Sequence, residues 1–563
     1  MSTECTPITT LPHTTRLFRD FLAMGESATA VRLRQWYGAE PLGSAWMQPP
    51  AASANAAALA DALERQSIAF GAGPATLANV AKLRAGARAV VTGQQVVLLG
   101  GPLLTLFKAA TAIARAKQAT AETGVEHVPI FWLATEDHDF EEVDQVSLLS
   151  KKAVETLRIN AKSHAAPVGN IPFDASIDAL LDRASELLHH APICNLLREC
   201  YASHPAHKQA PTFASAFARL MSRLFAEHGL IVMDAAGREF HTLGASTLRF
   251  AIEHAEELEA ALLARSAELE AAGYHAQVLV KPGASLLFLI SDVEGNPGVK
   301  NRQALHRLSD GSWKAGDTGK AEAGDPASST STAELLAILD AAPERLSPNA
   351  LLRSVFQDTV LPTTAYIGGP AEVAYFAQSA VLYQLILGRI TPILPRLSAT
   401  LIEPAIGAMM AQHEVNLPDA MLPAEELAQQ LAARTLPIEA KRRLADAGNA
   451  LDQALAAAQE VLGTLDESLG RSAEVSASKM RYQMDRMRRL AATFELHKDA
   501  SLRKHAEAIS LHLFPNAHPQ ERVLAGVWFL AAWESAHSNS AGLIARLVEE
   551  AASQCAGHLV IRL

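Results

Sequence analysis

Short, continuous runs of apolar residues alternate with longer amphipathic stretches along most of the chain. The apolar runs predict four buried strands, at Arg88–Val91, Val128–Leu133, Leu230–Met233 and Thr364–Ile367. Helices are expected from Leu103 to about Thr120, from Thr212 to Glu227 and from Glu372 onwards. Because strands that are apolar throughout must be covered on both faces, this alternation predicts an α/β fold with a parallel sheet at its centre.

The remaining segments predict additions to this sheet. Residues 1 to about 85 are expected to be mainly helical, and insertions are expected at about 150–210 and 274–345. The second insertion contains a candidate hairpin, in which Gln277–Lys281 and Leu286–Ile290 are joined through Pro282-Gly283. The polar stretch from Ser309 to Thr332 is expected to be a loop or linker.

Apolar residues alternate at spacings of four and three later in the chain. The series contains Leu444, Gly448, Leu451, Leu455, Ala458, Leu462, Leu465 and Leu469, and after a break near Gly470 it continues with Met480, Met484, Met487, Ala491 and Phe494. Two such seams predict an antiparallel coiled-coil hairpin, the arm, over residues 424–513. Packing within the chain is one use for the arm, but its length favours a contact between two copies and hence a homodimer.

This arm divides the chain into three predicted parts. They are a core at 1–423 that includes both insertions, the arm at 424–513, and a C-terminal segment at 514–563. The C-terminal segment is expected to pack back on the core and to end in a short strand at His558–Ile561.

The composition is that of a globular protein, with 49% hydrophobic and 19% charged residues in a chain of 563. The net charge of −11 disfavours general binding to nucleic acid. No apolar run is long enough to predict a membrane span, and the N-terminus lacks the apolar centre of a signal peptide. The four scattered cysteines contain no CxxC pair, so they predict neither a cysteine-rich zinc site nor a disulfide framework and favour a reducing, cytoplasmic location.

Polar residues follow the first predicted strand, at the edge where parallel sheets bind their ligands. Thr92-Gly93-Gln94-Gln95 offers two side-chain amides, and Gly100-Gly101 precedes a helix whose N-terminus would attract an anion. Lys108 lies further along that helix, at the limit of reach, and we include it in the binding set. The segment is neither a GxGxxG nor a Walker A motif, so it predicts no standard nucleotide loop, and a turn selected for packing is the alternative.

Three carboxylates surround an imidazole after the second strand, in Glu136-Asp137-His138-Asp139. In an extended segment Glu136 and His138 would point one way and the two aspartates the other, so one pair faces the site and the second orients it or caps a helix. A histidine beside carboxylates suits acid/base chemistry. Structural capping and metal ligation are the alternatives, although no HxH or HxxxH partner accompanies His138.

The fourth strand ends in a third polar segment, which contains Tyr366, Gly368, Gly369 and Glu372. Its Gly-Gly-Pro sequence again precedes a helix. Arg353, upstream of this strand, is a candidate clamp for an anion, with a surface salt bridge as the alternative.

In combination, these motifs resemble those of the BshC family, the cysteine-adding enzymes of bacillithiol biosynthesis. The matching residues, in chain order, are Leu11-Pro12, Thr92–Gln95, Gly101-Pro102, Lys108, Phe131-Trp132, Glu136–Phe140, Tyr366–Pro370, Glu372, Pro515-Asn516 and Pro519–Arg522. The match covers essentially the whole chain. The family commonly has Pro-Gly after the paired glutamines, whereas this chain has Val96-Val97, which changes the flexibility of the first loop.

The resemblance implies a Rossmann-like core with two connecting insertions and a coiled-coil arm that forms a dimer. It also implies the last step of bacillithiol synthesis, in which the carboxyl of L-cysteine is joined to the amine of glucosaminyl-malate. A free carboxylate does not form an amide in water without activation, so ATP or another activating nucleotide is expected. The resemblance suggests a nucleotide site at the C-terminal turn, formed by Asn516, Gln520, Glu521 and Arg522. Whether a metal takes part is left open.

Each polar segment is assigned a part in this reaction. His138 or Glu136 is the candidate base for the attacking amine, with Asp137 and Asp139 beside it in the catalytic set. Gln94, Gln95 and the amides of Gly100-Gly101 are expected to hold an anionic group. Two other functions remain open: a nucleotidyl- or adenylyl-transferase-like enzyme, against which the missing HxGH signature counts, and a non-catalytic coiled-coil protein that binds a metabolite.

Overall fold

The computed structural model describes residues 3–26, 30–159, 166–202, 210–293, 296–316, 329–537, 542–553 and 555–563. Its centre is a five-stranded sheet in the order β13-β12-β2-β3-β6, in which every pair of neighbours is parallel. The strands span Ile393–Pro395 (β13), Thr363–Gly368 (β12), Arg88–Gln94 (β2), His127–Leu133 (β3) and Ile231–Asp234 (β6). The predicted parallel α/β fold is confirmed, and β2 continues through Thr92, Gly93 and Gln94.

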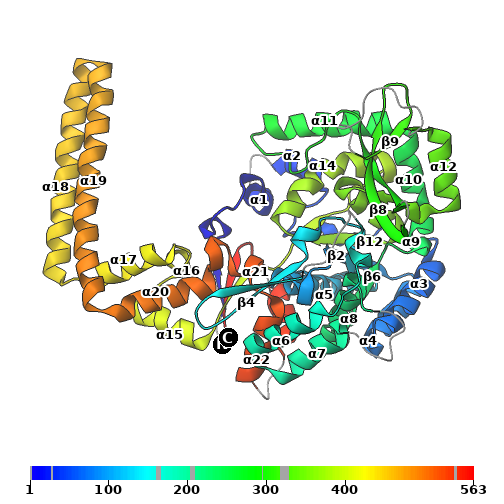
Figure 1. Ribbon diagram of the computed structural model, residues 1–563. Helices are drawn as coiled ribbons and strands as arrows, with labels where there is room; N and C mark the ends of the chain where they lie inside the picture. Colours follow the sequence, from blue (N-terminus) through cyan, green and yellow to red (C-terminus); the bar gives the residue numbers. More distant parts are fainter. Residues whose placement is uncertain are drawn as a thin grey trace.

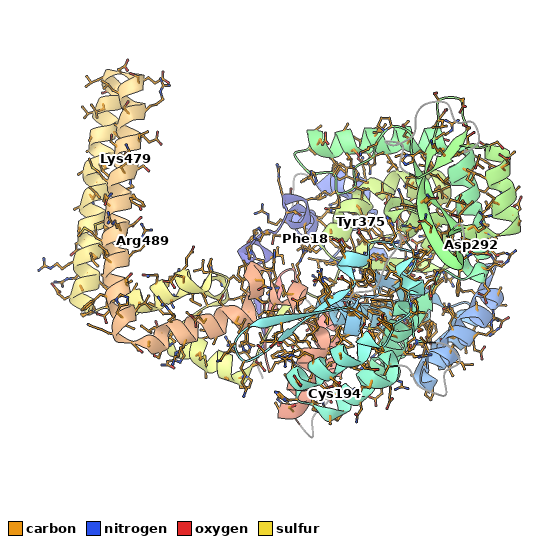
Figure 2. The ribbon with its side chains drawn as sticks, in the orientation of Figure 1. Phe18, Cys194, Asp292, Tyr375, Lys479 and Arg489 are labelled. Carbon is orange, nitrogen blue, oxygen red and sulfur yellow. A yellow bond between two sulfur atoms is a disulfide. The ribbon has the colours of Figure 1, made fainter. Side chains whose placement is uncertain are left out.

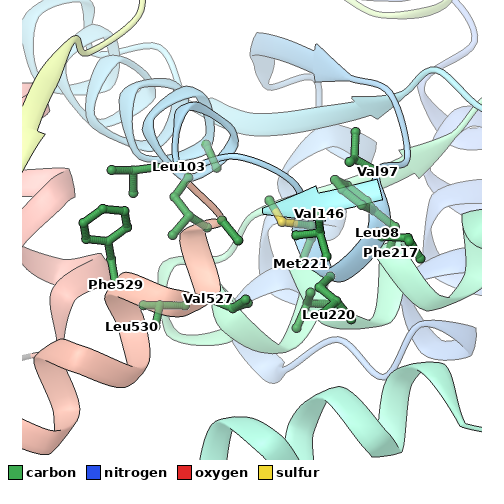
Figure 3. Close-up of a cluster of buried hydrophobic side chains, with 14 of the residues drawn as sticks. Val97, Leu98, Leu103, Val146, Phe217, Leu220, Met221, Val527, Phe529 and Leu530 are labelled. Atoms are coloured by element: carbon green, nitrogen blue, oxygen red, sulfur yellow. The ribbon is translucent and has the colours of Figure 1, made fainter. Parts of the chain in front are cut away.

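Both faces of the sheet are buried, which explains why its strands are apolar throughout. On β3, Phe131 and Leu133 pack into one hydrophobic cluster, and Ile130 and Trp132 pack into a second on the other face. Part of the first cluster is shown in Figure 3, where Leu98 and Leu103 lie near residues of α8 and α22 (Gly526–Ala536). The main covering helices are α5 (Leu104–Thr123), α8 (Phe213–Leu224), α13 (Ala350–Val360) and α14 (Pro370–Leu387).

The N-terminal region is helical where the sequence predicts it, except at its start. Its helices are α1 (Arg16–Leu22), α2 (Ala30–Tyr37), α3 (Ala56–Ala69) and α4 (Pro74–Arg84). Before them, Thr3–Thr6 forms β1, which pairs with β15 (His558–Arg562), and β15 in turn pairs with β14 (Ala399–Ile402). The predicted C-terminal strand therefore exists and joins the two ends of the chain.

The first insertion begins with a hairpin of β4 (Gln145–Leu149) and β5 (Val154–Arg158), followed by α6 (Ser176–Leu188) and α7 (Ala191–Tyr201). Residues 160–165 and 203–209 of this predicted insertion lie outside the described residues. After β6 the chain forms α9 (Arg238–Leu243), α10 (Ala245–Glu253) and α11 (Ala255–Ala271) before it enters the second insertion.

The second insertion contains a sheet in the order β10-β9-β8-β7-β11, and its predicted hairpin is wrong. β7 (Ala284–Val293) pairs with β8 (Asn296–Arg307) and β11 (Leu346–Pro348), whereas Gln277–Lys281 is not a strand. The backbone of Val278 is bound by a helix instead of a strand. The side chain of Gln378 on α14 accepts from the Val278 amide at 2.9 Å and donates to the Val278 carbonyl at 2.8 Å. These bonds use the backbone groups that a strand partner would need.

The polar stretch Ser309–Thr332 is not a loop throughout. It contains β9 (Trp313–Ala315) and β10 (Ser329–Thr330), and it ends at the start of α12 (Thr332–Ala341). Trp313 is fully buried, and its indole N–H donates to the Thr332 hydroxyl. Residues 317–328 of this stretch lie outside the described residues.

Within the predicted arm (424–513), the antiparallel hairpin that projects away from the rest of the molecule is formed by α18 (Ile438–Leu465) and α19 (Glu467–Lys498) alone (Figure 1). Lys479 and Arg489 lie on it, far from Tyr375 in the core (Figure 2). Its base is formed by α15 (Pro404–Gln412), α16 (Leu417–Ala420), α17 (Ala424–Thr435) and α20 (Ala500–Leu513), whose apolar residues share one buried cluster. The helices meet at Asp466, which caps α19, and not at Gly470, which lies inside α19 where the two backbones approach closely.

The residues of the predicted second seam do not all face α18: some are buried against it, and others lie on the exposed side of α19. Met484 is buried against α18, but Met480, Met487 and Phe494 are 50%, 56% and 59% exposed. Leu465 and Leu469 of the first seam are also exposed. A single hairpin therefore leaves part of the apolar repeat uncovered.

Candidate active site

A cavity of about 280 Å³ lies at the carboxyl ends of β2, β3 and β12. All three polar segments that the sequence singles out reach it. Its walls contain Gly93, Gln94, Gln95, Leu104, Lys108, Trp132, Ala134, Asp137, Arg353, Ser354, Gln357, Tyr366, Gly369, Pro370, Ala371, Glu372, Tyr375, Arg396 and Arg522. The position agrees with the rule that open parallel sheets bind ligands beyond the ends of their strands.

A buried ion pair between Lys108 and Glu372 forms one wall. The Lys108 ammonium lies 2.8 Å from the Glu372 carboxylate and donates to the Gly93 carbonyl and the Gln94 side-chain oxygen. Glu372 also accepts from the Tyr366 hydroxyl and the Gly369 amide. Burial lowers the pKa of Lys108 against the opposing effect of Glu372. Lys108 thus reaches the first loop, and the pair fixes the first and third polar segments relative to one another.

Arg353 supplies a positive charge that no carboxylate neutralises. It projects from α13 into the cavity, and among the described residues no carboxylate oxygen lies within 4.0 Å of its guanidinium. Burial opposes its charge, but Tyr375, Tyr366 and the more distant Asp137 raise its pKa. A largely buried cation that forms no direct ion pair is stabilised when a ligand supplies a negative charge, so this side of the cavity suits an anion.

Of the acidic loop, only Asp137 lines the cavity. One of its oxygens accepts from the His138 amide at 2.9 Å, and the other accepts from the Gln95 side chain at 3.1 Å. Burial would raise the pKa of Asp137, but Arg353, the Gln95 hydrogen bond and Arg302 outweigh burial and lower it. Asp137 is therefore ionised at neutral pH, and its charge faces the cavity opposite Arg353.

Glu136 points to the other side of the loop. Its carboxylate lies 3.0 Å from Nε2 of His241, which is completely buried on α9. Burial lowers the pKa of His241, but the Glu136 charge and hydrogen bond reverse this and raise it. The Glu136 carboxylate is thus turned towards His241, outside the cavity, a position that does not favour it as the base for a substrate amine.

His138 is also outside the cavity wall, and the second insertion holds it. Arg302 on β8 donates to Nδ1 of His138 at 3.1 Å, while its other nitrogens donate to the Ser347 hydroxyl and the Pro348 carbonyl. The Arg302 guanidinium also stacks on Phe288 at 3.6 Å. Since Arg302 can only donate, Nδ1 must carry a lone pair, and the proton of a neutral His138 lies on Nε2. This geometry does not favour His138 as a base, and Asp139 is exposed beside it.

The backbone positions of the predicted binding set have structural contacts. Thr92 is buried and donates to the Ile367 carbonyl, and Gly368 packs against Ile393. Gly100 and Gly101 have φ values of 85° and 72°, and the Gly101 carbonyl accepts from the amide of Gly526 in the C-terminal segment. The two glycines therefore make a left-handed turn that binds the chain's own C-terminal part, and they do not line the cavity.

Models of two consecutive domains of one family match the chain. Residues 1–397 match "Bacillithiol biosynthesis BshC, N-terminal Rossmann-like domain", and residues 399–563 match "Bacillithiol biosynthesis BshC, C-terminal coiled-coil domain". The chain belongs to the BshC family. Among its relatives, a protein of Koribacter versatilis (strain Ellin345) is 41% identical and one of Solibacter usitatus (strain Ellin6076) is 33% identical, each over the full length of both chains. Both are named "Putative cysteine ligase BshC".

Membership of the BshC family confirms the fold class and the enzyme class expected from the sequence motifs, which is a ligase. None of the helices in the described part of the chain combines the length and apolar character that crossing a membrane requires. Within those same residues, no cluster of three or more histidine, cysteine or carboxylate side chains is arranged to hold a metal ion.

The C-terminal turn borders a second cavity of about 400 Å³, next to the first. Arg396 and Arg522 line both cavities. Of the residues predicted to bind a nucleotide, Gln520 is buried and bonded to the backbone of Leu401, and Glu521 forms a buried ion pair with Arg396 at 2.6 Å. Asn516 is exposed and lines neither cavity. Of the four residues predicted to bind a nucleotide, only Arg522 lines both cavities.

Several residues of the cavity in this BshC member lie outside the set that the sequence assigned to the site. Trp132 belongs to an apolar strand, Tyr375 and Gln357 lie on helices, and Arg396 follows a short edge strand. Arg302 comes from an insertion more than a hundred residues away from His138. A motif signal existed for Tyr375, which is one turn beyond Glu372, but nothing in the sequence pattern separates Arg302 or Arg396 from ordinary surface arginines.

Proposed function

We propose that this BshC member joins the carboxyl of L-cysteine to the amine of glucosaminyl-malate, as the last step of bacillithiol synthesis in the cytoplasm. The observation that carries this proposal is the cavity charge: an unneutralised Arg353 faces an ionised Asp137 across the same space. Glucosaminyl-malate has the complementary chemistry, since it bears malate carboxylates at one end and an amine at the other. The relatives' name, "Putative cysteine ligase BshC", supports cysteine as one of the two substrates.

In this proposal Arg353 binds a malate carboxylate, with the Gln94 side-chain amide as a second donor. The Gln95 amide instead donates to Asp137 and Glu142. A guanidinium matches a carboxylate in shape and charge. Asp137 accepts from the substrate amine and orients it. Because the pKa of Asp137 is lowered, it is a weak proton acceptor, and it acts mainly by stabilising the positive charge that develops on nitrogen during attack.

An activating nucleotide fits the neighbouring cavity better than the cavity that contains Asp137. Arg522 forms no ion pair with any described residue and faces both cavities, so it is the residue that would hold a phosphate. Arg396 is neutralised by Glu521 and contributes less charge. When bound, the nucleotide would supply the leaving group that makes the cysteine carboxyl reactive.

We also propose that the arm forms a homodimer. Met480, Met487, Leu490 and Phe494 project from one face of α19 and are 50–62% exposed. Their spacing of seven, three and four residues is that of a coiled-coil seam, and an uncovered seam of this length is typical of an interface.

The function is tested by incubating the purified protein with L-cysteine, glucosaminyl-malate and ATP and measuring the thiol product by mass spectrometry. We expect product from the wild type. Exchange of pyrophosphate without product would support the nucleotidyl-transferase alternative, and binding without turnover would support the non-catalytic one. Either outcome contradicts the proposal.

Two variants separate the roles of the two charges. Arg353→Met should weaken binding of glucosaminyl-malate by about 10- to 100-fold in calorimetry, because a charge-assisted hydrogen bond is lost. Asp137→Asn should lower kcat by about 100-fold or more with a smaller change in binding. Asp139→Asn, at the exposed position in the same loop, is the matched control and should behave like the wild type. Unchanged binding in Arg353→Met would exclude the proposed carboxylate site.

A further inference from the structure

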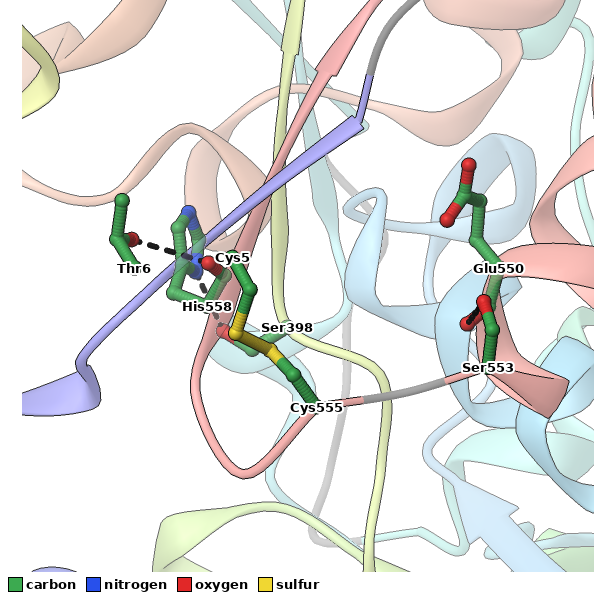
Figure 4. Close-up of a disulfide and its surroundings, with 7 residues drawn as sticks. All are labelled: Cys5, Thr6, Ser398, Glu550, Ser553, Cys555 and His558. Atoms are coloured by element: carbon green, nitrogen blue, oxygen red, sulfur yellow. Dashed lines mark hydrogen bonds between the residues drawn. A yellow bond between two sulfur atoms is a disulfide. The ribbon is translucent and has the colours of Figure 1, made fainter.

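The two ends of the chain are joined by a disulfide between Cys5 and Cys555, which the scattered cysteines did not predict (Figure 4). Cys5 lies on β1 and is exposed, and Cys555 precedes β15 and is partly exposed. The other two cysteines, Cys194 and Cys200, are free and buried. In a reducing compartment, a disulfide that solvent can reach is in most cases transient or redox-sensing. The position of this bond therefore raises the question of what reacts with it.

The disulfide borders a cavity that would admit a small thiol. This cavity measures about 590 Å³, and Cys5, Thr6 and Gly557 form part of its wall together with residues of α1. Thiol–disulfide exchange requires a thiolate to reach one of the two sulfur atoms. A cavity beside Cys5 gives an incoming thiol a place to bind before it reacts.

The charge of this cavity favours an anionic ligand. Arg19 of α1 lines it and forms no ion pair with any of the described residues. The carboxylate that also lines it, Glu40, is paired with Arg34 at 2.9 Å. Glu4 neighbours Cys5 in sequence but does not line this cavity. The unpaired charge in the wall of this cavity is thus positive.

We propose that the Cys5–Cys555 disulfide is an exchange site for anionic low-molecular-weight thiols. A thiolate bound near Arg19 attacks the sulfur of Cys5, which lines the cavity, so that a mixed disulfide forms on Cys5 and Cys555 is released as a thiolate. A second thiol then attacks the mixed disulfide, so that two small thiols leave as one small disulfide and both cysteines are reduced. The reverse sequence, with the small disulfide as oxidant, restores the bond. The site stands independently of the proposed function, although the proposed product is itself a thiol of this class.

Reduction by thiol exchange would remove the covalent link between the N-terminal segment and Cys555. β1 also pairs with β15 from Thr3 to Thr6, and the Thr6 hydroxyl donates to the His558 carbonyl, so the strand keeps its backbone partners after reduction. The segment after β1, including Ile8, Leu11 and Phe18, forms part of the second cavity beside Arg522. The N-terminal segment therefore has the disulfide at one end, and its other end lines the second cavity beside Arg522.

The proposal is tested on the full-length protein after oxidation with oxidised glutathione and removal of the excess. Native titration with a chromogenic disulfide should detect no reactive thiol, because Cys194 and Cys200 are buried. The oxidised protein is then treated with 3-mercaptopropionate or cysteamine at equal thiolate concentration. We expect reduction to two thiols per chain, at least three-fold faster with the anionic thiol, and an acid-trapped mixed disulfide on Cys5.

Matched variants on α1 identify the charge that is responsible. Arg19→Gln should lower the rate ratio of 3-mercaptopropionate to cysteamine by about three-fold. Arg16→Gln is the control, since Arg16 lies on the same helix and pairs with Asp20, and it should leave the ratio unchanged. The proposal is overturned if the oxidised protein still exposes two reactive thiols, or if the two thiols react equally fast with the wild type. No ligase assay is involved, so these outcomes are independent of the proposed function.

Discussion

Each nitrogen of the Arg302 guanidinium donates a hydrogen bond, and the bond to His138 determines the tautomer of that histidine. Arg302 donates to Ser347, Pro348 and Nδ1 of His138, and Phe288 covers its face. A group that can only donate leaves the partner nitrogen as an acceptor. In neutral His138 the lone pair therefore lies on Nδ1, and Nε2 carries the N–H group.

This tautomer gives a prediction that nitrogen NMR can test with ¹⁵N-labelled histidine. At pH 7.5 the His138 signal, assigned by its loss in His138→Gln, should show a proton on Nε2 and none on Nδ1. In Arg302→Met the Nδ1–H tautomer should appear, because the donor that excluded it is gone. Arg345→Met, at an exposed arginine of the same insertion, should not change the signal. A proton on Nδ1 in the wild type would contradict the assignment.

Elements of this protein differ in how completely the monomer buries them. α5 is covered on nearly all sides, by the central sheet and by α23 (Leu543–Ala552). α19 instead has Ala477, Met484, Ala492 and Leu496 buried, with an apolar stripe left exposed. Because both faces follow helical spacing, the arm can pair within the chain on one face and between chains on the other.

The arm prediction uses a double substitution on the exposed stripe. Met487→Glu with Leu490→Glu should convert a dimer into a monomer in sedimentation or light-scattering measurements, because charges would enter the contact. Helix content should remain unchanged, since both side chains are exposed in the single chain. Gln453→Glu with Ala456→Glu has the same spacing on α18 and is the matched control, expected to remain dimeric. A wild type that is monomeric at micromolar concentration would refute the proposed homodimer.

At the scale of the whole molecule, a small sheet joins the two ends of the chain to the Rossmann-like core. His558 of β15 is fully buried and bonds Ser398 and Thr400 through its two ring nitrogens, each at 2.8 Å. Burial lowers the pKa of His558 to about 4, against the opposing effect of Glu521. Its ordinary value is 6.5, so the unfolded chain binds a proton in a range where the folded chain does not.

It follows that His558 makes the fold less stable as the pH falls from about 6.5 to about 4. At about 1.4 kcal/mol per pKa unit, the contribution lost is on the order of 3 kcal/mol. Denaturant titrations at pH 7 and pH 4.5 should show a smaller loss of unfolding free energy in His558→Gln than in the wild type. His275→Gln, at an exposed histidine, should follow the wild type. Equal pH dependence in all three proteins would exclude a role for His558.

The sequence by itself determined the parallel sheet, most of its covering helices and the existence of the arm. These features depend on local periodicity: the run Val128–Leu133 is apolar because β3 is buried on both faces, and the heptad spacing follows from helix geometry. The same reasoning placed three polar segments at strand ends, where parallel strands bring them to one edge. Gln94, Asp137 and Glu372, one from each segment, do line one cavity.

Only the tertiary structure decided which member of each polar segment faces that cavity. Asp137 faces it and Glu136 does not, because His241 binds Glu136 from behind the loop. Gly101 binds Gly526 and Arg302 holds His138, through contacts between segments that lie far apart in sequence. Cys5 and Cys555 likewise meet because β1 and β15 pair. Periodicity describes the neighbours of a residue along its own helix or strand, whereas these partners come from other elements and are set by the packing of the whole chain.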